Sequence, residues 1–407
     1  MKVLHTADWH LGQKFFHRDR KEEHQKALNW LVQLIKDEKI ELLILAGDVF
    51  DTDSPPNYAR KLYYDFLKKL VGSCCRNIVV VAGNHDSPNM LDAAKELFKL
   101  LNVHVVGHIT KEREEQLVPI YDEDGELQTM VGAVPYLRDR DIRKSVAGET
   151  LEQRVENLRN GIQQHYEEML EVLQPYKDQN IPIIVTGHLF VAGGERGERQ
   201  NTIHIGSLDV IDASSFPPTF DYVALGHLHR SQKVDNQDRI RYSGALIPLD
   251  FSEINFDQMV NIVEFDGQNL HKVRSVRVPL TRKLRYYKGD LDYVKSKLSN
   301  LAGEVELPTW LKIEIETAHY SPGLLDDLEE IIANKPAEIF VLNQRAVNQT
   351  VAPIEEEANI QTLSDISELE VFKRCINTRG QVEATEMQGL ENTFKELLTW
   401  MEEKDVE

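Results

Sequence analysis

The chain has 407 residues, of which 41% are hydrophobic and three are cysteines, and its formal net charge at pH 7 is −20. This composition predicts a globular protein of about two or three domains. It excludes a disulfide framework and a C-x-x-C zinc site, because two of the cysteines are adjacent and the third is remote.

The same numbers bear on partners and location. The acidic charge argues against binding to nucleic acid unless local basic patches or a basic partner contact the phosphates. No stretch approaches the roughly 18 apolar residues of a membrane helix, and residues 1–12 lack the apolar core of a signal peptide. We therefore expect no membrane contact and a cytoplasmic location.

Five short apolar runs each end on a residue that can bind a metal ion. The runs are 3–7, 42–46, 78–82, 183–186 and 222–225, and they lead into D-x-H, GD, GNHD, GH and GHLH. Runs of this kind predict buried strands, and open α/β sheets place their ligands at the carboxyl ends of strands. The sequence therefore predicts one shared site built from five strand ends.

Stretches with a helical pattern lie between the first three of these predicted strands. Residues 22–35 and 58–70 carry apolar side chains at helical spacing. The alternation of strand and helix predicts an α/β fold in which helices cover a sheet. Strands expected over 240–243 and 259–265 have short connections, which predict hairpins and a second sheet.

A glycine-rich loop and a small domain follow in the chain. The sequence AGGERGERQ at 192–200 predicts a mobile loop close to His188, which either lies in solvent or touches substrate. In the stretch 281–345, residues 310–316 alternate as a half-buried strand does, with helices expected over 291–300 and 323–333 and another strand over 339–342. These elements predict a compact α+β domain.

The last part of the chain has a different character. Residues 346–362 lack apolar periodicity and predict a linker. Two amphipathic helices are expected over 363–407, and two short helices bury little on their own. They either fold back on the body or await the helices of another protein.

Seven side chains at the strand ends form the predicted metal-binding set. They are Asp8, His10, Asp48, Asn84, His188, His227 and His229. Side chains two apart on an extended segment point the same way, so Asp8 and His10 can share one ion, as can His227 and His229. Seven ligands exceed what one catalytic ion takes from protein.

The excess of ligands predicts two ions that share a bridging carboxylate, for which we choose Asp48. Asp8, His10 and His229 would complete one site, and Asn84, His188 and His227 the other. Oxygen and imidazole ligands without a thiolate suit manganese, iron or zinc. Two such ions lower the pKa of a water between them and bind a phosphate, so the chemistry expected is phosphate ester hydrolysis.

The residues beside these ligands have expected roles of their own. The leaving oxygen needs a proton, which His85 can supply as a general acid, with Asp86 orienting its ring. The alternative for His85 is contact with the phosphate or support of a ligand. Asp51 is expected to hydrogen-bond a ligand or the loop.

Two basic clusters are candidates for binding phosphates. One is Arg138, Arg140, Arg143 and Lys144, and the other is Arg18, Arg20 and Lys21. Contacts of this kind position a nucleic-acid backbone. Aspartates are interspersed in both clusters, so each is equally compatible with a mixed-charge surface in solvent.

The motifs DWH (8–10), GDVFD (47–51), GNHD (83–86), GH (187–188) and GHLH (226–229) resemble those of the calcineurin-like metallophosphoesterases. Longer segments, among them HTADWHLGQ, LAGDVFDTDSPP, VAGNHDS, ALGHLHR and YSGALIPLDFSE, are similar to the SbcD family of bacterial nucleases. The resemblance covers essentially the whole chain. It implies a four-layer α/β/β/α sandwich over 1–280, a capping domain over 281–345, a linker over 346–362 and a partner-binding helix-loop-helix over 363–407.

The resemblance also implies an activity and partners. The family's seven ligands carry over to the seven residues named above and its catalytic histidine to His85. The implied enzyme is a manganese-dependent nuclease acting in DNA recombination, replication and repair. It acts as an ATP-dependent 3′-to-5′ exonuclease on duplex ends, an endonuclease on single strands and a nuclease that opens DNA hairpins.

The implied partner is an SbcC-type ATPase whose coiled coil the C-terminal helices grip, with a homodimer of this chain inside a heterotetramer. The sequence contains no G-x-x-x-x-G-K-[ST] element, so a partner would have to hydrolyse the ATP. A phosphoesterase for nucleotides or other small molecules is the alternative, although a capping domain and helical tail have no obvious use there. A third possibility is a binding scaffold that has lost catalysis. Such a protein should lack some of the metal-binding residues, and none of them is missing here.

Overall fold

The computed structural model describes residues 1–16, 18–142, 149–192, 210–303, 305–317, 321–346, 390 and 393–394. The chain divides into two units, one of residues 1–315 with 321–343 and one of 316–320 with 344–407. Arg143, nearly all of the glycine-rich loop, the linker after residue 346 and almost the whole expected helical pair lie outside the described residues. The elements that build the predicted site all belong to the first unit.

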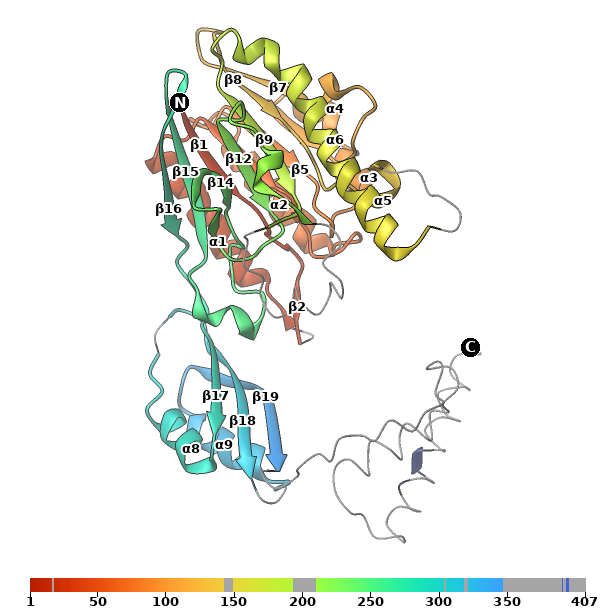
Figure 1. Ribbon diagram of the computed structural model, residues 1–407. Coiled ribbons are helices and arrows are strands. Elements are labelled where there is room, and N and C mark those ends of the chain that lie inside the picture. The colour runs from red at the N-terminus through yellow and green to blue at the C-terminus, as the bar shows by residue number, and fades with distance from the viewer. Residues whose placement is uncertain are drawn as a thin grey trace, which may run out of the picture. The chain divides into compact units, whose positions relative to one another are not determined.

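The first sheet has six strands in the order β16-β15-β1-β4-β5-β6. Figure 1 labels β16, β15, β1 and β5 of this sheet. The six strands are β1 (Lys2–Thr6), β4 (Leu42–Ala46), β5 (Asn77–Val81), β6 (Val103–Val106), β15 (Met259–Asp266) and β16 (Asn269–Arg277). The first four run parallel, and β15 and β16 are antiparallel additions beside β1. The strand expected at 259–265 is present as β15, and it forms a hairpin with β16. This hairpin extends the first sheet and not the second, because β15 carries apolar side chains on both faces and pairs with β1.

The second sheet also has six strands, in the order β13-β14-β12-β9-β8-β7. They are β7 (Leu117–Tyr121), β8 (Leu127–Gly132), β9 (Ile183–His188), β12 (Tyr222–Gly226), β13 (Gln232–Val234) and β14 (Gln237–Tyr242). Strands β8, β9, β12 and β14 are parallel, and the two edge strands are antiparallel. This sheet was only partly predicted, because its strands β7 and β8 gave no distinct pattern in the sequence.

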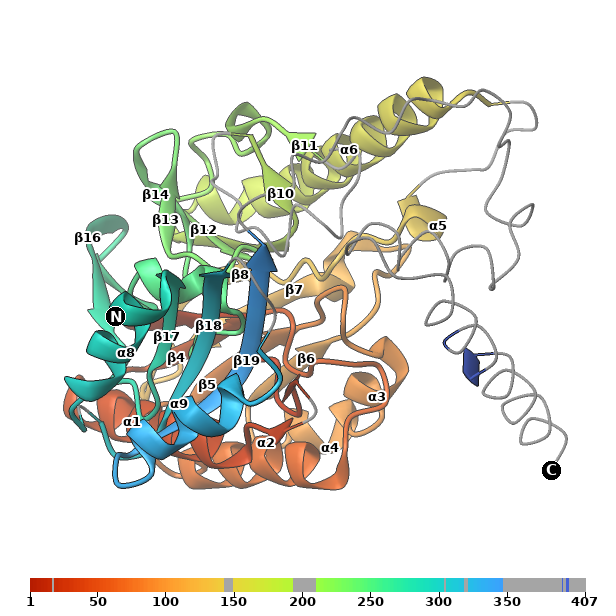
Figure 2. The same ribbon diagram turned by 90° about the horizontal axis from the view of Figure 1, so that it is seen from below.

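Three apolar cores hold these sheets and their helices together. Between the sheets, Val3 and Ile44 of the first pack with Ile184 and Ala224 of the second. The other face of the first sheet packs against α1 (Lys21–Asp37) and α2 (Asn57–Leu70), and the other face of the second packs against α6 (Leu151–Lys177). Figure 2 shows α1 and α2 on one side of the sheets and α6 on the opposite side. The helices α1 and α2 are those that the sequence predicted.

A third sheet contains β17 (Leu284–Gly289), β18 (Thr309–Thr317) and β19 (Ala337–Ala346), with helices α8 (Leu291–Ser299) and α9 (Leu324–Ile332). Leu311, Ile313 and Leu328 are among its core residues. The elements predicted from the sequence are present, and β17 is an addition. The alternation over 310–316 puts Glu314 on the polar face of this half-buried strand, opposite the apolar residues. The expectation that this face is exposed is wrong at Glu314, which is 3% exposed and accepts a hydrogen bond from the Tyr286 hydroxyl at 2.7 Å.

The remaining elements are short. They are β2 (Lys14–Phe15), β3 (Arg18–Asp19), α3 (Pro88–Asp92), α4 (Lys95–Lys99), α5 (Asp139–Ile142), β10 (Phe190–Val191), β11 (Val210–Ile211) and the 3-10 turns Arg113–Gln116, Ala213–Ser215 and Phe251–Asn255. Within the described part of the chain, no helix is long and apolar enough to span a bilayer.

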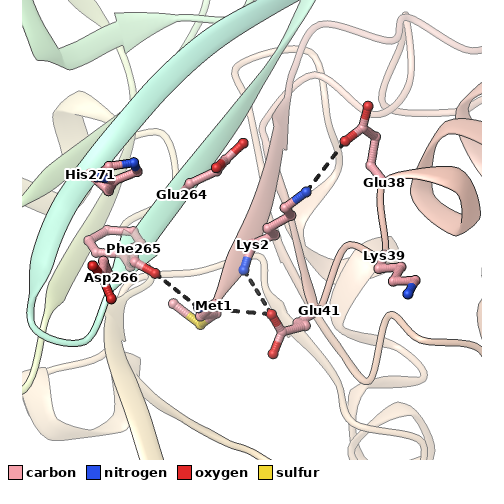
Figure 3. Close-up of a pocket in the computed structure, with 9 residues that line it drawn as sticks. All are labelled: Met1, Lys2, Glu38, Lys39, Glu41, Glu264, Phe265, Asp266 and His271. Carbon is pink, nitrogen blue, oxygen red and sulfur yellow. Dashed lines mark hydrogen bonds and ion pairs between the residues drawn. The ribbon is translucent and has the colours of Figure 1, made fainter.

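The amino-terminal end of β1 borders a shallow hollow of about 490 Å³ that is lined largely by charged side chains (Figure 3). The terminal amine donates to the carbonyl of Phe265 at 3.1 Å, and the Lys2 backbone amide donates to Glu41 at 2.9 Å. Lys2 also forms an ion pair with Glu38 at 3.5 Å. These bonds fix the start of β1, whose other end leads into the predicted metal ligands.

One buried histidine predicts how stability depends on pH. Burial lowers the pKa of His165 to about 3, below its ordinary value of 6.5, and neither of its ring nitrogens has a hydrogen-bond partner. Above pH 6.5 both folded and unfolded states leave the ring neutral. Below it only the unfolded state takes up the proton, so this residue should lower the free energy of unfolding by about 1.4 kcal/mol at pH 5.5.

The variant His165→Leu should therefore lose that part of the acid sensitivity in urea unfolding measured at pH 7.5 and pH 5.5. His271→Leu is the matched control, because His271 is exposed. An equal loss of acid sensitivity in both variants would contradict the explanation by burial.

Candidate metal centre

The five predicted strands exist, and their carboxyl ends meet at one edge. In the first sheet, β1, β4 and β5 are parallel neighbours, with Thr6 paired to Leu45 and Leu45 paired to Val80. In the second sheet, β9 and β12 are parallel neighbours, with His188 paired to Gly226. Each predicted ligand therefore lies at or just after the end of its strand.

Four of the seven ligands have backbone angles in the left-handed region. These are Asp8 (φ 52°), His10 (φ 45°), Asp48 (φ 49°) and His227 (φ 94°). Such a conformation costs a non-glycine residue about 1–3 kcal/mol and persists only where its surroundings hold it. Here the amide of Asp8 donates to the Gly47 carbonyl at 3.1 Å and that of His10 donates to the carbonyl of Asp48 at 3.0 Å. The strained turns aim these side chains toward one another.

Glycines in this region are needed mainly for close approach. A Cβ atom on Gly83 would lie 2.1 Å from Oδ1 of Asp48, and one on Gly226 would lie 1.9 Å from the Ala46 carbonyl oxygen. Neither of these two glycines has a positive φ, whereas Gly47 does, at 89°. The glycines before Asp48, Asn84 and His188 were expected to permit tight turns, and a positive φ is found at Gly47 but not at Gly83 or Gly187.

Asp48 lies between two of the predicted histidine ligands. Its Oδ2 atom is 3.2 Å from Nε2 of His188 and 3.5 Å from Nε2 of His10. Ligand atoms of Asp8, His10 and His229 lie within 4.8 Å of one another, as do those of Asp8, Asp48 and His188. This arrangement matches what a shared carboxylate between two ions requires.

Asn84 joins the second group of ligands. Its Oδ1 atom lies 3.0 Å from Nε2 of His188 and 3.1 Å from Nδ1 of His227. The backbone amide of His227 donates to the Asp8 carboxylate at 2.9 Å. All seven predicted ligands are thus brought together from the two sheets.

Three of the histidines have their outer ring nitrogen held by an oxygen. Nδ1 of His10 is 3.1 Å from the Asp51 carboxylate, and Nδ1 of His188 is 2.9 Å from the carbonyl of Ala46. Nδ1 of His229 is 2.7 Å from Oε1 of Glu253. Histidines that bind metals are usually oriented in this way, with the other nitrogen turned to the ion.

Of these three oxygens, the one from Asp51 was expected and the one from Glu253 was missed. Glu253 is 3% exposed and belongs to the 3-10 turn Phe251–Asn255. Glu253 is the last residue of the segment YSGALIPLDFSE, which was matched to a family from the sequence. An acidic residue within that segment was the only sequence signal that could have identified it.

The donors present fit divalent cations. Nε2 of His10 is buried without a hydrogen-bond partner in a residue that is 3% exposed, and such a buried polar atom is costly unless something binds it. The set offers carboxylate, amide and imidazole groups without a thiolate. These donors suit catalytic manganese, iron or zinc, and they argue against a structural zinc site. The residues therefore fit the pair of cations that the sequence predicted.

The titration of these groups points the same way. Burial lowers the pKa of His188, but the Asp48 carboxylate outweighs it and brings the pKa to about 9. Burial raises the pKa of the Asp8 carboxyl. A cation bound here would compete with the proton on His188, since metal ligands must release their protons on binding.

His85 lies beside the predicted ligands, and its ligand atom comes within 4.8 Å of those of His10 and Asp51. Its backbone amide donates to Oδ1 of Asp48 at 2.9 Å, and its Nδ1 donates to the carbonyl of Asp51 at 2.9 Å. Its ring lies 4.8 Å from that of His10, centre to centre. Burial lowers its pKa. The bond at Nδ1 leaves Nε2 as the nitrogen that can exchange a proton with a substrate.

The expected role of Asp86 is wrong. Its carboxylate accepts the backbone amides of Val49 at 3.1 Å, Phe50 at 2.9 Å and Gly83 at 2.8 Å, while the carbonyl of Asp51 orients the ring of His85. Burial raises its pKa to about 6. The backbone amides of Val49 and Phe50 after β4, and of Gly83 after β5, lie beyond the strands and have no partner in a strand ladder. The Asp86 carboxylate accepts all three and so links the two turns.

The structure separates the basic candidates. Arg138 donates from Nη2 to the carbonyl of Asp86 at 2.9 Å, next to the predicted site. Arg140 has a side chain that is 73% exposed, and Arg18 pairs with Glu338 on β19. Arg143 lies outside the described residues. Arg138 is therefore the candidate that the fold brings to the metal ligands.

Comparison with known families gives two matches along the chain. Residues 1–231 match the family model described as calcineurin-like phosphoesterase. Residues 280–379 match the model described as type 5 capsule protein repressor C-terminal domain. The second match begins just before β17, and residues 232–279 lie between the two matches.

Curated relatives align over nearly the whole length. The SbcD subunit of the nuclease SbcCD from Escherichia coli (strain K12) is 36% identical over 403 residues, which cover 97% of each chain. The protein of the same name from Bacillus subtilis (strain 168) is 31% identical over 420 residues, which cover all of both chains. Among solved structures, TT1561 of Thermus thermophilus aligns with a TM-score of 0.39 at 15% identity, covering 68% of this chain and 99% of that one.

Proposed function

Since this chain belongs to the calcineurin-like phosphoesterases, and within them to the SbcD family at 31–36% identity over nearly its full length, we propose that it is a nuclease that hydrolyses phosphodiester bonds in DNA. The observation that carries the proposal is the meeting of seven metal-binding side chains and His85 at one edge of the two sheets. Relatives of the same length are named as nuclease subunits.

The specific activities are those that the family implies. They are ATP-dependent 3′-to-5′ exonuclease action on duplex ends, endonuclease action on single strands and hairpin cleavage, with manganese as the ion. The relatives are named as one component of a nuclease called SbcCD, which supports an SbcC-type ATPase as the partner. A cytoplasmic location agrees with this role in DNA recombination, replication and repair.

Each ion has a set of residues to hold it. Asp8, His10 and His229 would hold one ion and Asn84, His188 and His227 would hold the other, with Asp48 available to both. When bound, two divalent cations lower the pKa of a water and stabilise negative charge on a phosphate. In its protonated form His85 can give a proton from Nε2 to the leaving oxygen, while its Nδ1 keeps the bond to the Asp51 backbone carbonyl that orients the ring. Arg138, anchored on Asp86, binds a neighbouring phosphate of the strand.

The finer architecture follows the same family. We assign residues 1–280 to a four-layer α/β/β/α sandwich, in agreement with the cores on both faces of each sheet. Residues 281–345 serve as the capping domain, and 363–407 as the helix-loop-helix that binds the partner's coiled coil. Both roles suit a macromolecular substrate better than a small one.

A nuclease assay tests the proposal. Purified protein with manganese is incubated with linear duplex DNA or circular single-stranded DNA, with and without the SbcC-type partner and ATP. We expect both DNAs to be cut, the duplex only with partner and ATP. Rapid hydrolysis of mononucleotides with both DNAs intact would instead favour a small-molecule phosphoesterase.

A homodimer is the final part of the proposal, and an exposed apolar patch supports it. Leu97, Leu100 and Leu101 around α4 are 63%, 79% and 47% exposed, and Tyr64 beside them is 43% exposed. Apolar groups gathered in this way on a surface mark sites of protein association. A second copy of the same patch can cover it symmetrically.

The variant Leu100→Glu should therefore weaken self-association by about tenfold or more, because it places a charge in an apolar contact. Sedimentation equilibrium would measure the shift from twice the chain mass to the single mass. Leu325→Glu on α9 is the matched control, since Leu325 is 40% exposed away from α4. A wild-type chain that sediments as a monomer at every concentration would contradict the dimer.

A further inference from the structure

A continuous network of buried polar groups begins at His229 and ends in the small third sheet. Its first link is Glu253, whose Oε1 holds Nδ1 of His229 at 2.7 Å and whose Oε2 accepts the backbone amide of Leu249 at 2.8 Å. The side chain of Gln13 donates to the carbonyl of Leu249 at 2.9 Å. The backbone amide of Gln13 donates to the carbonyl of the ligand His10 at 3.0 Å, so this residue joins the segment that carries His10 to the segment that seats Glu253.

The next links are charged and almost fully buried. Arg20 donates from Nη1 to Oε1 of Gln13 at 3.3 Å and to the carbonyl of Pro248. Its Nε donates to both oxygens of Glu23 at 3.1 Å. The side chains of Arg20 and Glu23 are 0% and 3% exposed. Arg20 and Glu23 are thus enclosed by protein, and water cannot replace either residue as the hydrogen-bond partner of the other.

Glu23 carries the network to the third sheet. Nε of Arg282 donates to its Oε1 at 3.0 Å, and the Arg282 side chain is 11% exposed. The guanidinium of Arg282 lies 4.0 Å from the centre of the Trp310 ring on β18 and donates to the carbonyl of Pro308. The Trp310 ring stacks on Phe340 of β19 at 4.3 Å. Arg282 therefore joins the sheet β17–β18–β19 to Glu23.

The energetics of such a network favour mechanical coupling between its members more than they favour the stability of the fold. Removing charges from water is costly, and a buried arginine–glutamate–arginine set contributes little stability beyond what apolar residues would give. Displacing one member, however, leaves the others buried without partners, which costs far more than the bond itself was worth. Small movements of Arg282 therefore act on Arg20, on Gln13 and on the segment around Leu249 that seats Glu253.

We propose that Arg20 and Arg282 are positioning residues for the metal centre, coupling the seating of the third sheet to the orientation of the His229 ring. The proposal rests on the metal pair assigned above and concerns the ion held by Asp8, His10 and His229. A movement of the third sheet, such as one caused by a bound substrate or partner, changes the affinity for that ion without any contact to it.

Manganese titration by calorimetry tests the coupling. The variant Arg282→Met removes the charge but keeps the length of the side chain, and we expect it to weaken one of the two ion affinities by about three- to thirtyfold while leaving the other unchanged. Glu253→Gln acts directly on His229 and should weaken the same affinity by about 10- to 100-fold. Arg282→Lys should restore part of the loss, because it returns the charge beside Glu23.

The matched control is Lys26→Met, because Lys26 forms an ion pair with Glu306 that also links α1 to the segment before β18 but lies outside the network. It should leave both affinities unchanged, and thermal unfolding should show that each variant is folded. Unchanged affinities in Arg282→Met, or equal losses in Lys26→Met, would overturn the coupling. If Arg282→Met is unfolded, Arg282→Lys and Glu23→Gln are compared instead, and normal affinities in both would overturn it. A wild-type chain that binds no manganese would sink the proposed metal centre itself, which is a distinguishable result.

Discussion

His85→Gln should still bind two divalent ions but should cut DNA about 10²- to 10⁴-fold more slowly than the wild type, the range expected when a positioned proton donor is lost. The imidazole is not among the seven predicted ligands. Its Nδ1 donates to the Asp51 carbonyl, and a glutamine side-chain amide can donate the same hydrogen bond. The remaining change is at the nitrogen that would meet the leaving oxygen. Single-turnover cutting of single-stranded DNA, together with calorimetric counting of bound manganese, measures both properties.

His108→Gln is the matched control for this substitution. His108 pairs with Asp92 at 2.8 Å on another part of the surface, and its side chain is 40% exposed. It should cut at the wild-type rate. Cutting by His85→Gln at that same rate would remove the proton-donor role, and loss of bound ions would mean that His85 supports the ligands instead.

Gly226→Ala should lower the free energy of unfolding by about 3 kcal/mol or more and weaken ion binding by about 100-fold. The added Cβ would lie 1.9 Å from the carbonyl oxygen of Ala46 and 2.8 Å from Nδ1 of His188. That carbonyl is the group that orients the His188 ring, so the two sheets would have to separate locally to admit the methyl group. Urea unfolding and manganese titration measure the two effects.

Gly323→Ala provides the comparison, because a Cβ there meets nothing within 4 Å and the backbone has no positive φ. We expect it to change stability by less than about 0.5 kcal/mol. A Gly226→Ala variant as stable as Gly323→Ala, with normal ion binding, would show that the close approach at Ala46 can relax.

The site could be predicted from the sequence because its signals are local. Each ligand follows an apolar run directly, as Asp48 follows 42–46 and His188 follows 183–186. Parallel strands then bring residues that are distant in sequence to the same edge, which is a general property of such sheets. The helices α1 and α2 were equally accessible, because their apolar spacing is regular.

What could not be predicted depends on contacts between distant segments. Glu253 reaches His229 across a turn whose shape the sequence does not reveal, and Asp86 turns from His85 to the backbone of Val49. The hairpin of β15 and β16 joins β1 because of edge pairing that its own pattern does not specify. In the same way, the burial of Glu314 required knowing that Tyr286 lies opposite it.

The ligands come from both large sheets, three strand ends from one and two from the other. Ions held by these residues would therefore cross-link two halves of the protein whose facing sheets pack through apolar side chains. Ion binding at a hundredfold excess over Kd adds about 2.7 kcal/mol to the stability of the folded state. Chelation should consequently lower the melting temperature and loosen the seam between the halves before either half unfolds.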